Sequence, residues 1–248
     1  MKIYDAHCHI FPEKIALKAS LSIGDFYGGA PMFCSALLDN LKLYGERAGI
    51  EKYLVCSSAV VPRQVFGIND FITYSCRSDS SLVGLGSMHP DYYGIPEELD
   101  RIVELGLLGI KLHPDYQGVY FDDIRYMRIM EYASELGLII VTHAGVDIGF
   151  PDTVRCTPER ALKVLREVKP EKLVLAHMGG WSLWEEVIDR LAGEPVYLDT
   201  AYTMGHISEE HFVTLCRKHG TDKILFATDC PWGNPEKDVE TFLTMPLT

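Results

Sequence analysis

Short apolar segments recur along the chain, each bounded by Gly, Pro, Asp or Ser. They begin at residues 2, 52, 82, 109, 138, 173, 195 and 223, with the sequences KIYDAHCHI, KYLVCSSAV, LVGLGSMHP, GIKLHP, LIIVTHAG, LVLAHMGG, PVYLDTAY and KILFATDCPW. Short, near-continuous apolar runs are typical of strands buried on both faces, as in parallel sheets. The pattern therefore predicts eight parallel strands.

Amphipathic segments lie between these runs and predict helices. Residues 122–136 carry apolar side chains at helical spacing, and Gly137 follows as a stop signal. In residues 157–170, Thr157 is a suitable N-cap, and Pro158 fits the first helical position. Strands and helices are therefore expected to alternate along the chain.

Two more helices follow towards the C-terminus. Ser182 and Glu185 have the spacing of a capping box and predict a helix over residues 182–193. Residues 208–219 begin with a serine and two glutamates, and Gly220 is a suitable end. Both segments place a helix after an apolar run, as the alternating pattern requires.

This alternation predicts an α/β fold, a (β/α)8 barrel formed by one domain over residues 1–248. A doubly wound open sheet is the alternative, and it predicts a glycine-rich G-x-G-x-x-G turn after an early strand. The sequence contains no such turn. Polar residues instead follow the carboxyl ends of the strands, where barrels build their active sites.

Composition narrows the class of protein further. Of 248 residues, 47% are hydrophobic and 23% charged, which is typical of a soluble globular protein. No apolar run reaches 18 residues and the N-terminus is too polar for a signal peptide, so we expect a cytoplasmic protein. The net charge of −12 argues against nucleic acid or an anionic membrane as a partner. Seven scattered cysteines without a C-x-x-C pair predict reduced thiols.

The first apolar run carries polar side chains on one face. Side chains alternate along a strand, so His7 and His9 share a face and Cys8 points the other way. Asp5 lies on the histidine face, one step deeper. We expect Cys8 to pack against the outer helices as a small apolar residue.

Other strands end in similar residues. Lys111 and His113 share a face, and His143, His177 and Asp229 follow later strands. Any one of them alone is more often structural, but five of the nine histidines end four strands, which chance placement does not explain. Converging imidazoles and a carboxylate suit a divalent transition metal such as zinc. Two of the remaining histidines lie on a polar helix and are expected to be exposed, His211 and His219.

The segments DAHCHIFPE, GIKLHPDYQG, VTHAG, LAHMGG and ATDCPWG resemble the amidohydrolase superfamily. They are most similar to the amidohydrolase-related branch, which includes aminocarboxymuconate-semialdehyde decarboxylase-like enzymes. The resemblance implies a metal-bearing barrel in which His7, His9 and His143 are metal ligands. It further implies that Asp229 binds metal or water, and that His177 orients the water or binds a second metal.

The number of ions is open at this point. In two-metal members of the superfamily a carbamylated lysine bridges the ions, and Lys111 is the residue in that position. One-metal members lack the bridge. We expect one ion, zinc before manganese or iron, with Lys111 or His113 facing the substrate.

The resemblance implies hydrolysis of an amide, ester or lactone of a small molecule, with Asp229 as general base and then acid. Nonoxidative decarboxylation of an unsaturated or aromatic acid is the alternative on the same scaffold. A barrel that has lost catalysis is a third reading. It is disfavoured because the implied metal ligands are all present.

Several further residues are expected around the substrate. Arg155 is the expected cation for a substrate carboxylate. Aromatic residues and a histidine near the strand ends are expected at the pocket wall and rim: Trp181, Tyr202, His206 and Trp232. Residues 11–31 are expected to form a lid loop. Relatives usually continue past residue 248, so a partner chain is expected to complete the wall in a homodimer.

Overall fold

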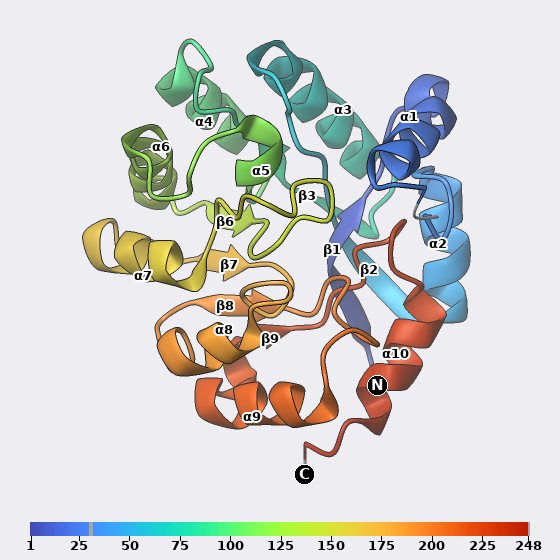
Figure 1. Ribbon diagram of the computed structural model, residues 1–248. Helices are drawn as coiled ribbons and strands as arrows, with labels where there is room; N and C mark the ends of the chain where they lie inside the picture. Colours follow the sequence, from blue (N-terminus) through green and yellow to red (C-terminus); the bar gives the residue numbers. More distant parts are fainter. Residues whose placement is uncertain (30–31, 248) are drawn as a thin grey trace.

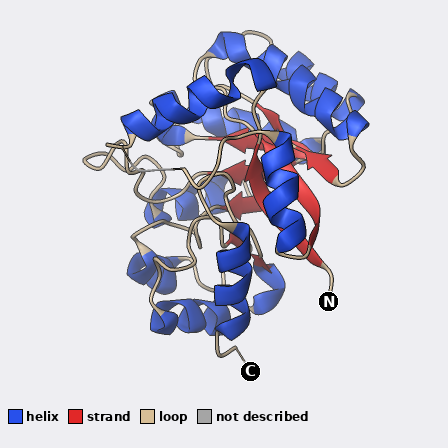
Figure 2. Ribbon diagram, turned by 90° about the vertical axis from the view of Figure 1, so that its right-hand side faces the viewer, coloured by secondary structure: helices blue, strands red, loops and turns tan. Residues whose placement is uncertain are grey.

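Parallel strands surround the centre of the molecule, and helices lie outside them (Figures 1 and 2). The structure is a computed structural model that describes residues 1–29 and 32–247. The strands are β1 Ile3–His9, β2 Ile50–Cys56, β3 Leu82–Gly84, β4 Gly86–Ser87, β5 Gly109–Leu112, β6 Ile139–Thr142, β7 Leu173–Leu175, β8 Tyr197–Asp199 and β9 Ile224–Leu225. Each falls within or beside one of the eight apolar runs, and the third run contains two short strands.

All strand pairs are parallel, in the orders β1-β2-β3 and β4-β5-β6-β7-β8-β9. The Leu85 N–H, between β3 and β4, donates to the Val55 carbonyl at 2.9 Å and joins the two groups. On the other side, the Ala6 N–H donates to the Phe226 carbonyl at 2.9 Å, which brings the last strand beside β1. These bonds close the ring, so the fold is the predicted (β/α)8 barrel and not an open sheet.

The helices are α1 Glu13–Phe26, α2 Leu38–Arg47, α3 Val65–Ser78, α4 Ile95–Glu104, α5 Pro114–Gln117, α6 Ile124–Glu135, α7 Pro158–Glu167, α8 Trp184–Arg190, α9 Glu209–His219 and α10 Pro235–Thr244, with 3-10 turns at Pro62–Gln64 and Thr221–Lys223. The predicted Thr157 cap is confirmed, and Ser208 forms a second cap at the start of α9. The Thr157 side chain accepts from the Arg160 N–H, and the Ser208 side chain accepts from the His211 N–H.

The prediction that residues 11–31 form a lid loop is wrong for most of this segment. Glu13–Phe26 is a helix of 14 residues, because its lysines, alanines and leucines favour a helix more than its glycine opposes one. Residues 30 and 31 of the expected loop lie outside the described residues. The cover over this side of the barrel is therefore largely helical.

The predicted capping box at Ser182 is also absent from the structure. Ser182 adopts a left-handed conformation with φ 63°, and α8 starts two residues later at Trp184 without a side-chain cap. The predicted exposure of His219 is contradicted as well. Its Nε2 donates to the Val196 carbonyl at 2.9 Å and its Nδ1 accepts from the Gly193 N–H, so the ring is buried as a bridge between loops.

The core has two parts. The larger lies between strands and helices and contains Cys8, which is fully buried as predicted. A separate cluster contains Val141 and Val174, which pair in register with each other; Val141 also pairs with Lys111. Neighbours in register point to the same side of a sheet, so this cluster fills the barrel interior beneath the strand ends. Within the described residues, no helix is long and apolar enough to cross a membrane.

The break in the third strand is held by Asn69 of α3, which is fully buried. Its amide donates to Glu98 at 2.6 Å and to the Ser87 carbonyl at 3.3 Å, and it accepts from the Ser87 N–H at 2.7 Å. Asn69→Leu leaves these buried partners without a hydrogen bond to protein or water. We therefore expect the free energy of unfolding to fall by about 3 kcal/mol in urea titrations. Asp70→Asn, on the exposed side of the same helix, is the control, with an expected change within about 0.5 kcal/mol. Equal effects of the two substitutions would contradict this role of Asn69.

Candidate active site

Four strand ends bring a cluster of imidazoles and a carboxylate together at one mouth of the barrel. His9 Nε2 lies 3.0 Å from Asp229 Oδ1, and His7 Nε2 lies 3.6 Å from the same oxygen. Opposite them, His143 Nδ1 lies 3.0 Å from His177 Nε2. The ring centroids of His7 and His177 are 6.0 Å apart, which connects the two pairs. The structure thus brings together the five residues expected to bind a metal.

Lys111 reaches the same cluster from β5. Its Nζ lies 2.8 Å from His7 Nε2, and its side chain is among the largest fully buried ones. No carboxylate among the described residues lies within ion-pair distance of this amine. A buried lysine amine without a directly paired carboxylate is suited to hold an anionic group of a ligand.

Outer hydrogen bonds fix which nitrogen of two rings faces the cluster. His7 Nδ1 lies 2.9 Å from Asp199 Oδ2, and His177 Nδ1 donates to the Ala201 carbonyl at 2.7 Å. With the proton on Nδ1, the Nε2 atom of each ring carries a lone pair directed into the cluster. This arrangement is the one that metal-binding histidines use, so the residues fit a divalent metal ion.

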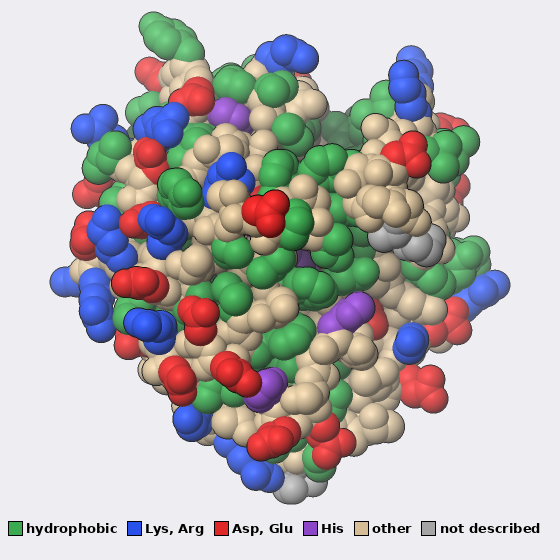
Figure 3. Space-filling model, in the orientation of Figure 1, with side chains coloured by type: hydrophobic (Ala, Val, Ile, Leu, Met, Phe, Trp, Pro, Cys, Tyr) green, Lys and Arg blue, Asp and Glu red, His purple; other side chains and the backbone are tan. Residues whose placement is uncertain are grey.

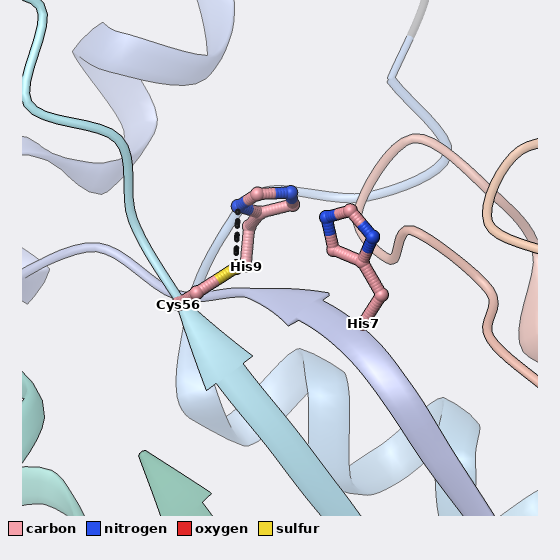
Figure 4. Close-up of side chains that lie close together, drawn as sticks. All are labelled: His7, His9 and Cys56. Carbon is pink, nitrogen blue, oxygen red and sulfur yellow. Dashed lines mark hydrogen bonds between the residues drawn. The ribbon is translucent and has the colours of Figure 1, made fainter. Parts of the chain in front are cut away.

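His9 has a sulfur as its outer partner. Figure 4 shows the Cys56 side chain directed at His9, with Cys56 Sγ 3.7 Å from His9 Nδ1. Burial alone would raise the pKa of the Cys56 thiol, but the neighbouring His9 and His7 lower it to about 5. Cys56, His9 and His7 have donor atoms within metal-binding distance of one another. Because the other nitrogen of His9 faces Asp229, we assign Cys56 as the outer partner of His9.

His143 has an incomplete outer contact. Its Nε2 lies 3.9 Å from Asp115 Oδ2, and both atoms are buried without a hydrogen-bond partner. Burial and the nearby Asp147 raise the pKa of Asp115 to about 6. A small approach of the two side chains would complete the bond and orient His143 in the same way that Asp199 orients His7.

His113 lies beside the cluster, but its proton is on Nε2, whereas His7 and His177 carry theirs on Nδ1. Its Nδ1 accepts from the Tyr116 N–H at 3.3 Å, so the proton is on Nε2, 3.6 Å from Asp147 Oδ2. His113, His143 and Asp147 are close enough for a metal site. However, the two imidazole rings are stacked at 4.4 Å and 12°, so their lone pairs do not converge on one point. His113 is therefore placed to contact a ligand as a donor.

A cavity of about 750 Å³ opens above this cluster. Figure 3 shows hydrophobic side chains gathered at the centre of this face, with histidine visible among them. Most of the cavity wall is apolar. Its aromatic lining residues are Phe11, Phe26, Tyr27, Phe71, Tyr116, Phe150, Trp181, Tyr202 and Trp232. The size and the wall suit a small molecule that carries an apolar ring.

The end of α1 covers part of the cavity. Tyr27 donates to Asp147 at 3.1 Å and contacts the hydroxyl of Tyr116, and Phe26 packs on Phe150 with centroids 5.4 Å apart. The residues expected to act as a lid thus close one side through a helix end. Sequence reasoning missed Asp147, because an aspartate in a loop is ordinarily solvated.

Two of the expected rim residues do not line the cavity. Arg155 has one guanidinium nitrogen 3.5 Å from Asp115, and His206 stacks on Tyr202. Arg63 lines the cavity instead, on the turn before α3. The structure therefore gives no support to the expectation that Arg155 meets a substrate carboxylate, because its guanidinium lies beside the buried Asp115 and does not line the cavity.

The fold agrees with the comparisons to known proteins. The sequence profile of the family described as amidohydrolase matches residues 4–248. The chain therefore belongs to the amidohydrolase family. No curated protein matches this sequence.

Solved structures with the same fold include several decarboxylases. The 5-carboxyvanillate decarboxylase from Sphingomonas paucimobilis is 15% identical with a TM-score of 0.73, covering 100% of this chain and 93% of that one. A variant of the enzyme from Novosphingobium aromaticivorans, with bound manganese, is 14% identical with a TM-score of 0.75, covering 100% and 92%. The 2,6-dihydroxybenzoate decarboxylase from Rhizobium is 18% identical with a TM-score of 0.72, covering 100% and 93%.

Weakening the hydrogen bond between Asp199 and His7 tests the metal site directly. Asp199→Asn keeps the side-chain shape but weakens the hold on the His7 N–H, so we expect metal affinity to fall about 10- to 100-fold. A competition titration against a fluorescent chelator at fixed pH measures it. Asp122→Asn, which removes a carboxylate paired with Arg160 on the outside, is the matched control. An unchanged affinity in Asp199→Asn would show that this bond does not orient a ligand.

Proposed function

We propose that this protein is a metal-dependent decarboxylase that removes CO2 from a small aromatic carboxylic acid without an oxidant. The observation that carries the proposal is the aromatic cavity, whose floor is the histidine–aspartate cluster with Lys111. An aromatic ring packs against such a wall while its carboxylate meets the positively charged floor. The similar structures that act on 2,6-dihydroxybenzoate and 5-carboxyvanillate support the same class of substrate.

One divalent transition-metal ion would be held by His7, His9, His143 and Asp229, with His177 beside it. Zinc is the ion expected from the sequence, and the manganese in three of the similar structures makes manganese the other ion to test. When bound, the ion supplies Lewis-acid chemistry that draws electron density from oxygen atoms of the substrate. Burial lowers the pKa of His143 and His177, which keeps both imidazoles neutral and able to act as ligands.

Lys111 takes the role for which Arg155 was expected. Its buried ammonium would pair with the substrate carboxylate and set its direction relative to the ring wall. The apolar wall destabilises the charged carboxylate, but it does not destabilise the neutral CO2 that leaves. Burial of the ring therefore favours the loss of CO2. His113, through its Nε2 proton, would contact a polar group on the substrate ring.

Asp229 is the group placed to move the proton. Burial would raise the pKa of its carboxyl, but the hydrogen bond with His9 and the nearby His7 hold it below its usual range. Asp229 is therefore ionised between turnovers, and it would take up a proton from a water molecule in the site, which leaves hydroxide. It would give that proton to the ring carbon as the bond from this carbon to the carboxylate breaks and CO2 leaves.

Hydrolysis is the second candidate function, because Asp229 could equally take a proton from a water molecule that attacks a carbonyl carbon. The two reactions differ in their products. Metal-loaded protein is given a panel of hydroxybenzoates and, in parallel, esters, lactones and amides of similar size. We expect CO2 from the acids and no acid release from the others. Hydrolysis without CO2 would favour the second function, and no turnover of either kind would favour a non-catalytic barrel.

A further inference from the structure

Two cysteines lie beside the candidate site without a role in it. Cys34 Sγ and Cys230 Sγ are 4.0 Å apart, and both are free thiols. Cys34 lies between α1 and α2, and Cys230 lies between β9 and α10. Figure 1 shows α2 and α10 side by side, so these segments meet although 196 residues separate the two cysteines.

Backbone hydrogen bonds hold both segments in place. The Cys34 N–H donates to the Pro231 carbonyl at 3.3 Å, and the His9 N–H donates to the Cys230 carbonyl at 2.7 Å. The Cys230 N–H donates to Thr228 Oγ1 at 3.0 Å. A disulfide needs a sulfur–sulfur distance of about 2.05 Å, so the sulfurs must approach by roughly 2 Å. Side-chain rotation with a small loop shift supplies such a movement.

The two thiols differ in exposure. Cys230 is 1% exposed, whereas Cys34 is only half-buried. A small oxidant in solvent therefore reaches Cys34 first, and Cys230 is the thiol next to it. This order is that of a sensing and a resolving cysteine.

We propose that Cys34 and Cys230 form a reversible disulfide in response to a peroxide. The Cys34 thiol first releases its proton; the thiolate attacks one oxygen of hydrogen peroxide, the O–O bond breaks, and Cys34 sulfenic acid and hydroxide form. The hydroxide takes up the released proton and becomes one water. Cys230 then attacks the Cys34 sulfur, the S–O bond breaks, and the disulfide and a second water form. The peroxide is reduced by two electrons, and the two thiols supply them.

The disulfide would act on the candidate site through its neighbour in sequence. Cys230 directly follows Asp229, whose N–H donates to the His7 carbonyl at 2.9 Å. A pull on the Cys230 side chain therefore displaces the carboxylate expected to bind metal. The cross-link also ties the segment after α1 to the segment before α10. Oxidation is expected to lower metal affinity about tenfold or more, and dithiothreitol is expected to restore it.

The test maps disulfides in the full-length protein. Reduced protein, freed of reductant, receives equimolar hydrogen peroxide; remaining thiols are alkylated and the digest is analysed by mass spectrometry. We expect one peptide pair joined through Cys34 and Cys230, with two thiols lost per chain and both recovered with dithiothreitol. Cys34→Ser and Cys34→Ala are both expected to lose the cross-link. Cys76→Ser, a half-buried thiol on α3, is expected to keep it.

Two results would overturn the proposal. One is Cys34 oxidised to the sulfinic acid or alkylated, without a joined peptide. The other is a cross-link of Cys230 to Cys8, which pairs with it on β1, in place of Cys34. Neither result depends on decarboxylation, so this proposal and the proposed function fail separately.

Discussion

Replacing His7 and His9 together by alanine is expected to remove the metal ion and to reduce turnover to background. The two rings contribute facing Nε2 atoms on one strand, and they share the Asp229 carboxylate at 3.6 and 3.0 Å. Without them the site keeps too few ligands for a tetrahedral or larger coordination. Elemental analysis of protein purified without chelator or affinity-tag metal is expected to give about one ion per chain in the parent and none in the variant.

The control for this variant is His211→Ala, which removes a half-exposed imidazole on α9. It is expected to keep the ion and the activity. About two ions in the parent would contradict the one-ion site and favour a bridging, carbamylated Lys111. A parent that binds no metal, even after zinc or manganese is added, would contradict the metal assignment as a whole.

Asp229→Asn is expected to lower kcat about 1000-fold when enough metal is supplied to keep about one ion per chain. The amide keeps an oxygen towards the cluster, but it cannot carry the proton that the ring carbon must receive. Steady-state kinetics beside elemental analysis separates the two effects. Asp222→Asn, on an exposed turn before β9, is the matched control and is expected to keep the parent kcat. A kcat within tenfold of the parent in Asp229→Asn would assign proton transfer to another group.

The barrel and the cluster could be predicted because simple repeating rules determine them. Alternation along a strand places His7 and His9 on one face, and parallel strands bring their carboxyl ends to one mouth. The outer partners escaped prediction. Asp199, Cys56 and Asp115 come from segments far apart in the chain, and each residue type is common in ordinary loops and cores. Only the closed barrel shows which imidazole nitrogen each of these three residues faces.

Local signals failed where tertiary contacts outweighed them. Ser182 has the spacing of a cap, but the approach of Trp181 to Gly145 on the neighbouring loop leaves Ser182 in a left-handed turn. His177 and Asp229 also have positive φ values, 60° and 62°, which sequence patterns do not reveal. Such conformations are costly for residues other than glycine and are frequent at functional sites. They turn these two side chains into the cluster.

The release of labelled CO2 tests the central claim most directly. Metal-loaded protein, the same protein stripped by chelator, and Asp229→Asn are each incubated with carboxyl-¹³C hydroxybenzoates, and ¹³CO2 is measured by mass spectrometry. Decarboxylation at this site predicts ¹³CO2 from the metal-loaded protein alone, in equal amount to the decarboxylated ring product. No ¹³CO2 above the chelated control from any acid of the panel, with the ion bound, would contradict it.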